Sequence, residues 1–170
     1  GGGGFMIDQV RWFLGDISEA GGYGTEHVWH QPGSADNGFL LMQTADGRVG
    51  QVHASWSEWR RYRYQVEIYG TSGYVRFGYS PLWLSYAQGE PRPRSWPRYH
   101  FFPWFQLMER LKGYQWSLTN MYEADMRSWI NAITTGSKLV TSGHDGREVV
   151  RIAQSISLTG QFAAVDEILT

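Results

Sequence analysis

The residues best suited to chemistry lie close together at 56–65, where ring-bearing side chains are interleaved with charged ones. The set comprises Trp56, Glu58, Trp59, Arg60, Arg61, Tyr62, Arg63 and Tyr64. Flat rings stack on the faces of sugars and nucleobases, and Glu58 and Arg60 can bind hydroxyl groups. Alternate rings can equally cover a sheet face at a subunit interface. Because the formal net charge is -1, we expect no nucleic-acid partner, and predict sugar contacts, a subunit interface, or both.

Other side chains that often do chemistry give weaker signals. On a strand, His27 and His30 would point to opposite faces, so we predict no metal site. The absence of cysteine excludes a thiolate ligand or a thiol nucleophile. His144 and Asp145 could form an acid–base pair, but an N-cap role for Asp145 is the preferred interpretation. No catalytic residue is assigned.

Two glycine-rich segments lack the features of a phosphate loop. Residues 21–26, GGYGTE, lack the third glycine of G-x-G-x-x-G and precede a predicted strand rather than a helix. The four glycines at 1–4 precede a helix, but no strand comes before them. We therefore expect no cofactor to bind this chain alone, and we interpret residues 1–4 as a linker or a truncation scar.

Length and composition bound the class of protein. The 170 residues suit one domain, taken as residues 5–170, and aromatic residues make up 16%. No apolar run is long enough to span a bilayer, and the N-terminus does not have the order of a signal peptide. We expect a cytoplasmic protein without a membrane partner.

Periodicity predicts an α+β domain. Apolar spacing favours a helix over 6–14, and Asp46-Gly47 favours a hairpin turn followed by further strands up to residue 88. Four prolines predict a loop over 89–104, and helical spacing returns over 120–135 and 144–157. The expected architecture is an open, mostly antiparallel sheet of about five or six strands with helices packed on one face.

Four segments in order resemble the C-terminal domain of the Gfo/Idh/MocA family, the relatives of glucose-fructose oxidoreductase and inositol dehydrogenase. They are residues 6–16, 36–56, 66–77 and 133–157. The resemblance implies a missing Rossmann domain that carries the dinucleotide loop and a catalytic lysine, with NAD or NADP as the cofactor of the intact enzyme. It also implies a sugar or cyclitol substrate and a homo-oligomer formed through the open sheet face.

The family's first-helix motif is only partly present. In the preferred register Asp8, Arg11, Trp12 and Gly15 match it, but Phe5 stands where the family has a histidine. An alternative register instead places Trp12 at the histidine position. In either register the catalytic histidine is missing. Asp8 is carried over as a substrate-binding candidate.

Two functions follow from this resemblance. The first is the substrate-binding and oligomerisation half of an NAD(P)-dependent sugar or cyclitol oxidoreductase, and the second is a stand-alone, non-catalytic carbohydrate-binding or scaffold protein. A Rossmann fingerprint encoded upstream of Phe5 would favour the first. The substrate-binding candidates are Asp8, Trp56, Glu58, Trp59, Arg60 and Tyr122.

Overall fold

The computed structural model describes residues 3–26, 28–29, 35–59, 62–79, 82–89, 96–139, 141–157 and 162–164. The chain divides into two compact units, Gly1–Glu58 with Val140–Thr170 and Trp59–Leu139, and each is described by itself. His27, His30 and Arg60 lie outside the described residues. Within the described ranges, no helix is both long and apolar enough to cross a membrane.

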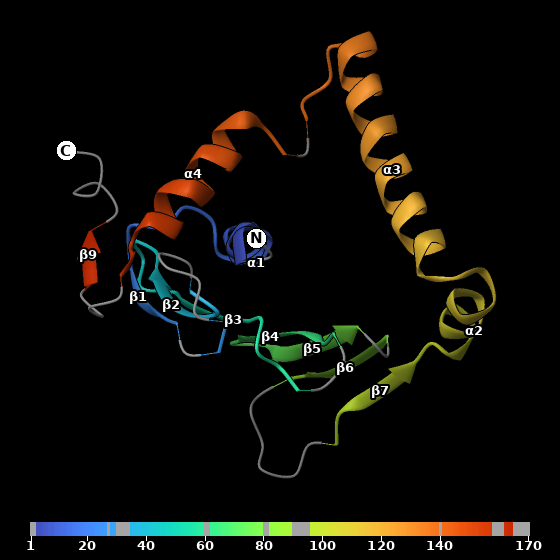
Figure 1. Cartoon of the computed structure of the whole chain (residues 1–170), viewed down its shortest axis with the longest axis horizontal. Helices are drawn as coiled ribbons and strands as arrows, with labels where there is room; N and C mark the ends of the chain where they lie inside the picture. Colours follow the sequence, from blue (N-terminus) through green and yellow to red (C-terminus); the bar gives the residue numbers. More distant parts are fainter. Residues whose placement is uncertain are drawn as a thin grey trace. The chain divides into compact units, whose positions relative to one another are not determined.

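The first unit is an open sheet with two helices (Figure 1). Its elements are α1 (Gly3–Leu14), β1 (Glu19–Thr25), β2 (Asn37–Gln43), β3 (Val49–Ser55), α4 (Gly143–Gln154), β8 (Ile156–Ser157) and β9 (Phe162–Ala164). The sheet order is β3-β2-β1, and β8 and β9 also pair with β1. The β2–β3 hairpin turns at Asp46-Gly47, as predicted, with Gly47 at φ 85°. GGYGTE lies mainly in β1, as expected of a glycine-broken strand.

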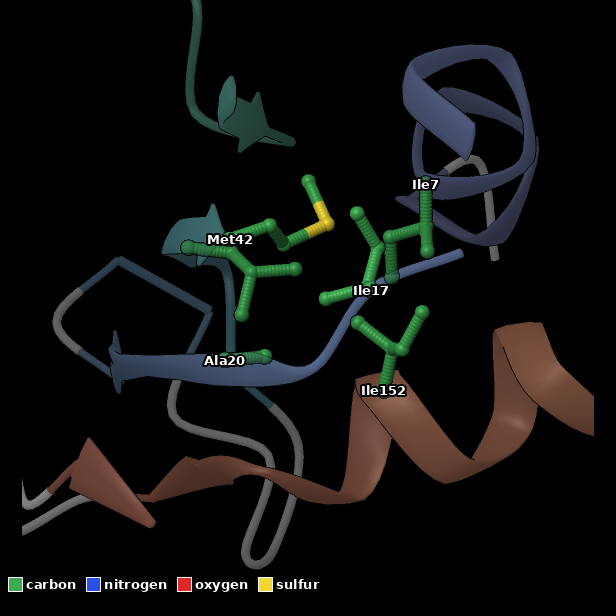
Figure 2. Close-up of a cluster of buried hydrophobic side chains, with 6 residues drawn as sticks. Ile7, Ile17, Ala20, Met42 and Ile152 are labelled. Carbon is green, nitrogen blue, oxygen red and sulfur yellow. The ribbon is translucent and has the colours of Figure 1, made fainter. Parts of the chain in front are cut away.

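Both helices of this unit cover the same face of β1–β3. Ala20 and Met42 are direct partners in the register, so their side chains point to the same face of the sheet. They pack with Ile7 of α1 and Ile152 of α4 in one buried cluster (Figure 2). The predicted packing of helices on one sheet face is therefore confirmed for this unit.

Helix α1 runs along β3 in the opposite direction. A Cβ on Gly3 would lie 3.9 Å from that of Ala54, whereas one on Gly50 would lie 2.6 Å from Val10 Cγ1 and 2.9 Å from Leu14 Cδ1. The side chains of α1 thus occupy the space above Gly50. The N-terminal turn of α1 comes close to the end of β3 that leads into Trp56.

Gly50→Ala is expected to lower the free energy of unfolding by about 1–3 kcal/mol, because the added methyl group overpacks the α1–β3 contact. Gly38 is the matched control, since it lies in the same sheet and a Cβ there would meet no atom within 4 Å. Urea unfolding of Gly50→Ala and Gly38→Ala measures the difference. Equal losses in the two variants would contradict the close approach of α1.

The second unit is a four-stranded antiparallel meander followed by two helices. It contains β4 (Tyr64–Gly70), β5 (Gly73–Tyr79), β6 (Trp83–Gln88), β7 (Arg98–Phe101), α2 (Pro103–Lys112) and α3 (Tyr114–Thr135). The sheet order is β4-β5-β6-β7. Neither α2 nor α3 contains a buried residue.

The α+β class with open, mostly antiparallel sheets is confirmed, but the strands form two sheets rather than one. Among the described strands, β3 pairs with β2 and β4 pairs with β5, and no ladder joins β3 to β4. Residues 56–63, which connect them, contain no Asn-Gly or Asp-Gly pair to close a hairpin. The ladder is therefore interrupted at the aromatic and arginine-rich segment.

Three local predictions needed correction. The loop prediction was wrong for 98–101, which form edge strand β7, because Pro97 and Pro103 flank this segment instead of interrupting it. Pro103 also begins α2, where a proline is favoured because its missing N–H is not needed. Helix α1 begins at Gly3, before the expected Met6.

The N-cap of α4 is Ser142, not Asp145. The Ser142 side chain accepts from the backbone N–H of Asp145, and the Asp145 carboxylate accepts from the backbone N–H of Ser142 at 2.8 Å. This reciprocal capping box begins three residues earlier than expected, because the serine preceding Gly143 caps as well as an aspartate does. The hydrogen bonds from the backbone and side chain of Ser142, together with the nearby Arg11, lower the pKa of Asp145 to about 2.

The capping box predicts an acid-sensitive α4. The pKa of Asp145 is about 2 in the folded chain against the ordinary 3.8, so its stabilisation is complete above pH 3.8 and is lost as the pH falls through about 2. Asp145→Asn should therefore destabilise the chain at neutral pH, and this difference from the wild type should shrink toward pH 2. Unfolding midpoints measured across this range test it. Asp125→Asn on α3 is the control, and an equal, pH-independent loss in both variants would contradict the capping role.

Candidate functional site

The end of the first unit's sheet carries a compact polar cluster. Asn37 and Ser55 are partners at the last rung of β2 and β3. The Asn37 amide donates to Ser57 Oγ at 2.8 Å, and the hydroxyls of Ser55 and Ser57 lie 3.2 Å apart. These short side chains present donors and acceptors at this end of the sheet.

Asp36 anchors this end of the sheet. It is only 4% exposed, and its carboxylate accepts from the backbone N–H of Val28, from that of Trp29 at 3.2 Å and from the Asn37 amide at 3.1 Å. Its own backbone bonds to Thr25 and Trp56 at 2.8 Å each. Because a buried carboxylate is costly unless its oxygens are paired, these donors explain how Asp36 stays buried.

Of the predicted substrate contacts, Trp56 and Glu58 lie beside this cluster. Trp56 follows β3 directly and is 68% exposed, and Glu58 is also exposed. Trp59 is fully exposed and is assigned to the second unit with Tyr122, which lies exposed on α3. Arg60 lies outside the described residues. Among the predicted contacts at 56–60, Trp56 is therefore the one with the most defined surroundings.

Asp8 lies in an ion cluster between α1 and α4. Its carboxylate is 3.7 Å from Arg11 Nη1, and the carboxylates of Asp16 and Asp145 lie 3.5 and 3.4 Å from the same guanidinium. Arg11 is buried, and its Nη1 also donates to the Asp145 carbonyl. The observed contact of Asp8 is thus an ion pair with Arg11 within α1, and a substrate contact stays a prediction.

Glu148 forms a second buried ion group, on α4. Burial opposes its ionisation, but Arg151, His144 and Arg147 outweigh burial, and the net effect lowers the pKa of Glu148. Arg151 donates to its carboxylate from both Nε and Nη2. His144 Nε2 lies 4.0 Å from a carboxylate oxygen of Glu148, so the geometry favours ion pairing with Glu148 over an acid–base pair with Asp145.

The second unit holds its own polar network where α2 meets β5. The Tyr79 hydroxyl donates to Glu109, and Ser117 Oγ donates to the same carboxylate oxygen at 2.9 Å. Burial and the nearby Glu109 carboxylate raise the pKa of Tyr79. Burial also raises the pKa of Tyr64, to about 12. Both phenols therefore stay protonated at neutral pH, and this network joins elements of the fold.

The sheet face away from α1 and α4 carries a row of stacked rings. Tyr23, Phe39 and His53 are register partners across β1, β2 and β3. Tyr23 stacks on Phe39 with ring centroids 5.3 Å apart, and Phe39 stacks on His53 at 4.3 Å and 7°. Leu41 and Val49 extend the exposed apolar surface on this face. The open face predicted to carry an interface is thus aromatic.

Within the described residues, neither glycine-rich segment forms a phosphate-binding turn. Each residue of β1 has a register partner in β2, so GGYGTE is part of a ladder and does not form a turn that could wrap a pyrophosphate. Gly3 and Gly4 are already helical in α1. Across the described ranges, no group of three His, Cys, Asp or Glu side chains could hold a metal ion. We therefore derive no hydride-transfer step within this chain.

The sequence alone did not predict a role in the site for four residues, Trp29, Asp36, Asn37 and Ser57. Asp36-Asn37 directly before an apolar strand was read only as part of the family resemblance, although such a pair commonly organises neighbouring backbone. The partners of Asp36 come from three separate segments, and such long-range hydrogen bonds leave no periodic signal. In the sequence, Trp29 lies between His27 and His30, which were weighed only as metal ligands.

Comparison with known proteins gives this arrangement a family context. Residues 3–76 match the GFO/IDH/MocA C-terminal domain. The resemblance predicted from the sequence is confirmed. The inositol 2-dehydrogenase of Rhizobium meliloti (strain 1021) is 24% identical over 154 residues, which are 88% of this chain and 43% of that protein. The chain thus spans less than half the length of this relative.

Solved structures agree on the fold. A levoglucosan dehydrogenase in complex with NADH and L-sorbose has a TM-score of 0.73 at 20% identity, over 96% of this chain and 48% of its own. An oxidoreductase from Agrobacterium radiobacter in complex with NAD+, L-tartaric acid and magnesium has a TM-score of 0.69 at 18% identity, over 98% and 48%. Likenesses at this identity establish a shared fold.

Proposed function

We propose that the chain is the substrate-binding and oligomerisation domain of an NAD(P)-dependent oxidoreductase of sugars or cyclitols. The observation that carries the proposal is the match of residues 3–76 to the GFO/IDH/MocA C-terminal domain. The inositol 2-dehydrogenase relative and the NADH complexes of similar folds support the substrate class and the cofactor class. The chain spans 43% of the relative, so the redox activity is proposed for a protein that also contains a dinucleotide-binding domain.

Substrate binding is assigned to the end of β1–β3. A sugar or cyclitol ring has an apolar C–H face and hydroxyl groups along its edge, so its binding requires an aromatic surface beside short polar side chains. Trp56 supplies an exposed ring, and Asn37, Ser55 and Ser57 supply the polar groups. In such a site the chain would bind and orient the ring, while the nicotinamide and the proton acceptor would come from the dinucleotide-binding domain.

Oligomerisation is assigned to the open face of the same sheet, between copies of this chain. Tyr23, Phe39 and Leu41 form an exposed apolar surface on this face, and an exposed apolar patch is typical of a protein–protein interface. In the described part of β1, β2 and β3, Glu19 is the one formally charged residue that the register places on this face. Two identical faces of this kind can meet without like-charge repulsion, which suits a symmetric interface.

Ligand titration of the 170-residue chain tests the substrate assignment. We expect saturation-transfer NMR to detect binding of myo-inositol or a pyranose at millimolar concentration, and no micromolar binding of NADH or NADPH. Sorbitol, an open-chain polyol, is the matched control and should bind more weakly, because it offers no fixed apolar face. Micromolar binding of NADH, or no response to any ring ligand, would overturn the proposed division of roles.

A further inference from the structure

We propose that Trp29 and Trp56 form a two-indole platform for the apolar face of a sugar or cyclitol ring, and that Asp36 positions both. The inference rests on the proposed function and deepens it, because neither Trp29 nor Asp36 is assigned by the family resemblance. The two indoles are 63% and 68% exposed and come from segments far apart in the sequence.

Trp29 is held at two points. Its backbone N–H donates to the Asp36 carboxylate at 3.2 Å, and its indole Nε1–H donates to the Trp56 carbonyl at 3.1 Å. The ring's single donor is therefore satisfied by the protein, so the indole does not need a ligand hydrogen bond to fix its direction. A ring held in this way loses little entropy when a ligand stacks on it.

Trp56 is tied to the same aspartate. Its backbone N–H donates to the Asp36 carbonyl at 2.8 Å, so a single buried residue connects the main chain of both tryptophans. The Asp36 carboxylate accepts from the backbone N–H groups of Val28 and Trp29 and from the side-chain amide of Asn37. Asp36 is thus a positioning residue, and the ligand contacts belong to the indoles.

The polar groups that accompany the platform favour a polyhydroxylated ring over a purely apolar ligand. The Asn37 amide bridges Asp36 and Ser57, and Ser55 lies within 3.2 Å of Ser57. These hydroxyls can rotate to donate to, or accept from, ring hydroxyl groups. A pyranose or cyclitol offers both a C–H face for the indoles and hydroxyls for this cluster.

Variants of the full chain test the platform with myo-inositol and D-glucose as probes. Trp29→Ala and Trp56→Ala should each weaken ring binding by about tenfold, the usual effect of removing one stacking ring. Trp96→Ala is the matched control, since Trp96 is exposed in the second unit and should leave binding unchanged. Isothermal titration or saturation-transfer NMR gives the affinities.

Asp36→Asn tests positioning separately from contact. Both tryptophans remain, but the amide has one acceptor oxygen in place of two, so we expect weaker binding and a shift of the Trp29 indole resonance. Should Asp36→Asn not fold, the two tryptophan variants decide alone. Ring binding that is equal in the wild type, Trp29→Ala and Trp56→Ala would overturn the platform and leave the proposed function standing. Absence of ring binding by the wild type would overturn both.

Discussion

Replacing Ile152 with alanine is expected to lower the free energy of unfolding by about 2–5 kcal/mol. Ile152 is fully buried, and it joins α4 to Ile7 of α1 and Met42 of β2 in the cluster of Figure 2. Alanine removes three carbons and leaves a cavity among elements that ladders and helix contacts hold in place. The loss should appear in urea unfolding followed by far-UV circular dichroism.

Val150→Ala is the matched control for this experiment. Val150 lies on the same helix but is 57% exposed, so its truncation should cost less than about 1 kcal/mol. A loss in Ile152→Ala no larger than that in Val150→Ala would show that α4 does not pack on the sheet as described.

The second large effect is expected at the open sheet face, where Phe39→Glu should dissociate the oligomer. Phe39 lies between Tyr23 and His53 in the stacked row, so the substitution places a carboxylate at the centre of the proposed interface. In a symmetric contact two such charges face each other, which costs several kcal/mol and weakens association by about 100-fold or more. Sedimentation velocity at tens of micromolar should show an oligomer for the wild type and a monomer for Phe39→Glu.

Val150→Glu provides the control for charge itself. It adds the same carboxylate to the helix layer of the same unit, at a side chain that is already exposed, and should leave the oligomer intact. A wild-type chain that sediments as a monomer, or a Phe39→Glu variant that keeps the wild-type mass, would contradict an interface on this face.

Local signals in the sequence predicted the parts of the fold that depend on few residues. Asp46-Gly47 marked the hairpin, and Gly15 and Gly136 marked helix ends, because each turn requires the positive φ that glycine readily adopts. The division into two sheets was not predictable in this way. Whether β3 pairs with β4 depends on contacts between distant parts of the chain, and the alternation of residues within a strand does not specify its neighbour.

The same distinction holds at the candidate site. Trp56 and Glu58 stood out because aromatic and charged residues cluster in sequence, and the structure places them beside the polar end of the sheet. Asp36 was missed because its significance comes from donors at Val28, Trp29 and Asn37, and hydrogen bonds of this kind appear only in the folded chain. The helix predicted over 120–135 is a further case. Helical spacing predicted that five of its apolar residues share one face, although no residue of α3 is buried within its unit; they are Tyr122, Met126, Trp129, Ile130 and Ile133.

Chemical-shift mapping of the labelled chain with myo-inositol and with NADH separates the proposed role from its alternatives in one experiment. We predict that the cyclitol shifts the Trp29 and Trp56 indole resonances and the Asn37 side-chain amide, which lie together at the end of β1–β3. NADH at micromolar concentration should shift no resonance. Cyclitol-induced shifts confined to residues outside this end of the sheet, or a saturable micromolar response to NADH, would contradict the assignment of this chain as the substrate-binding half of the enzyme.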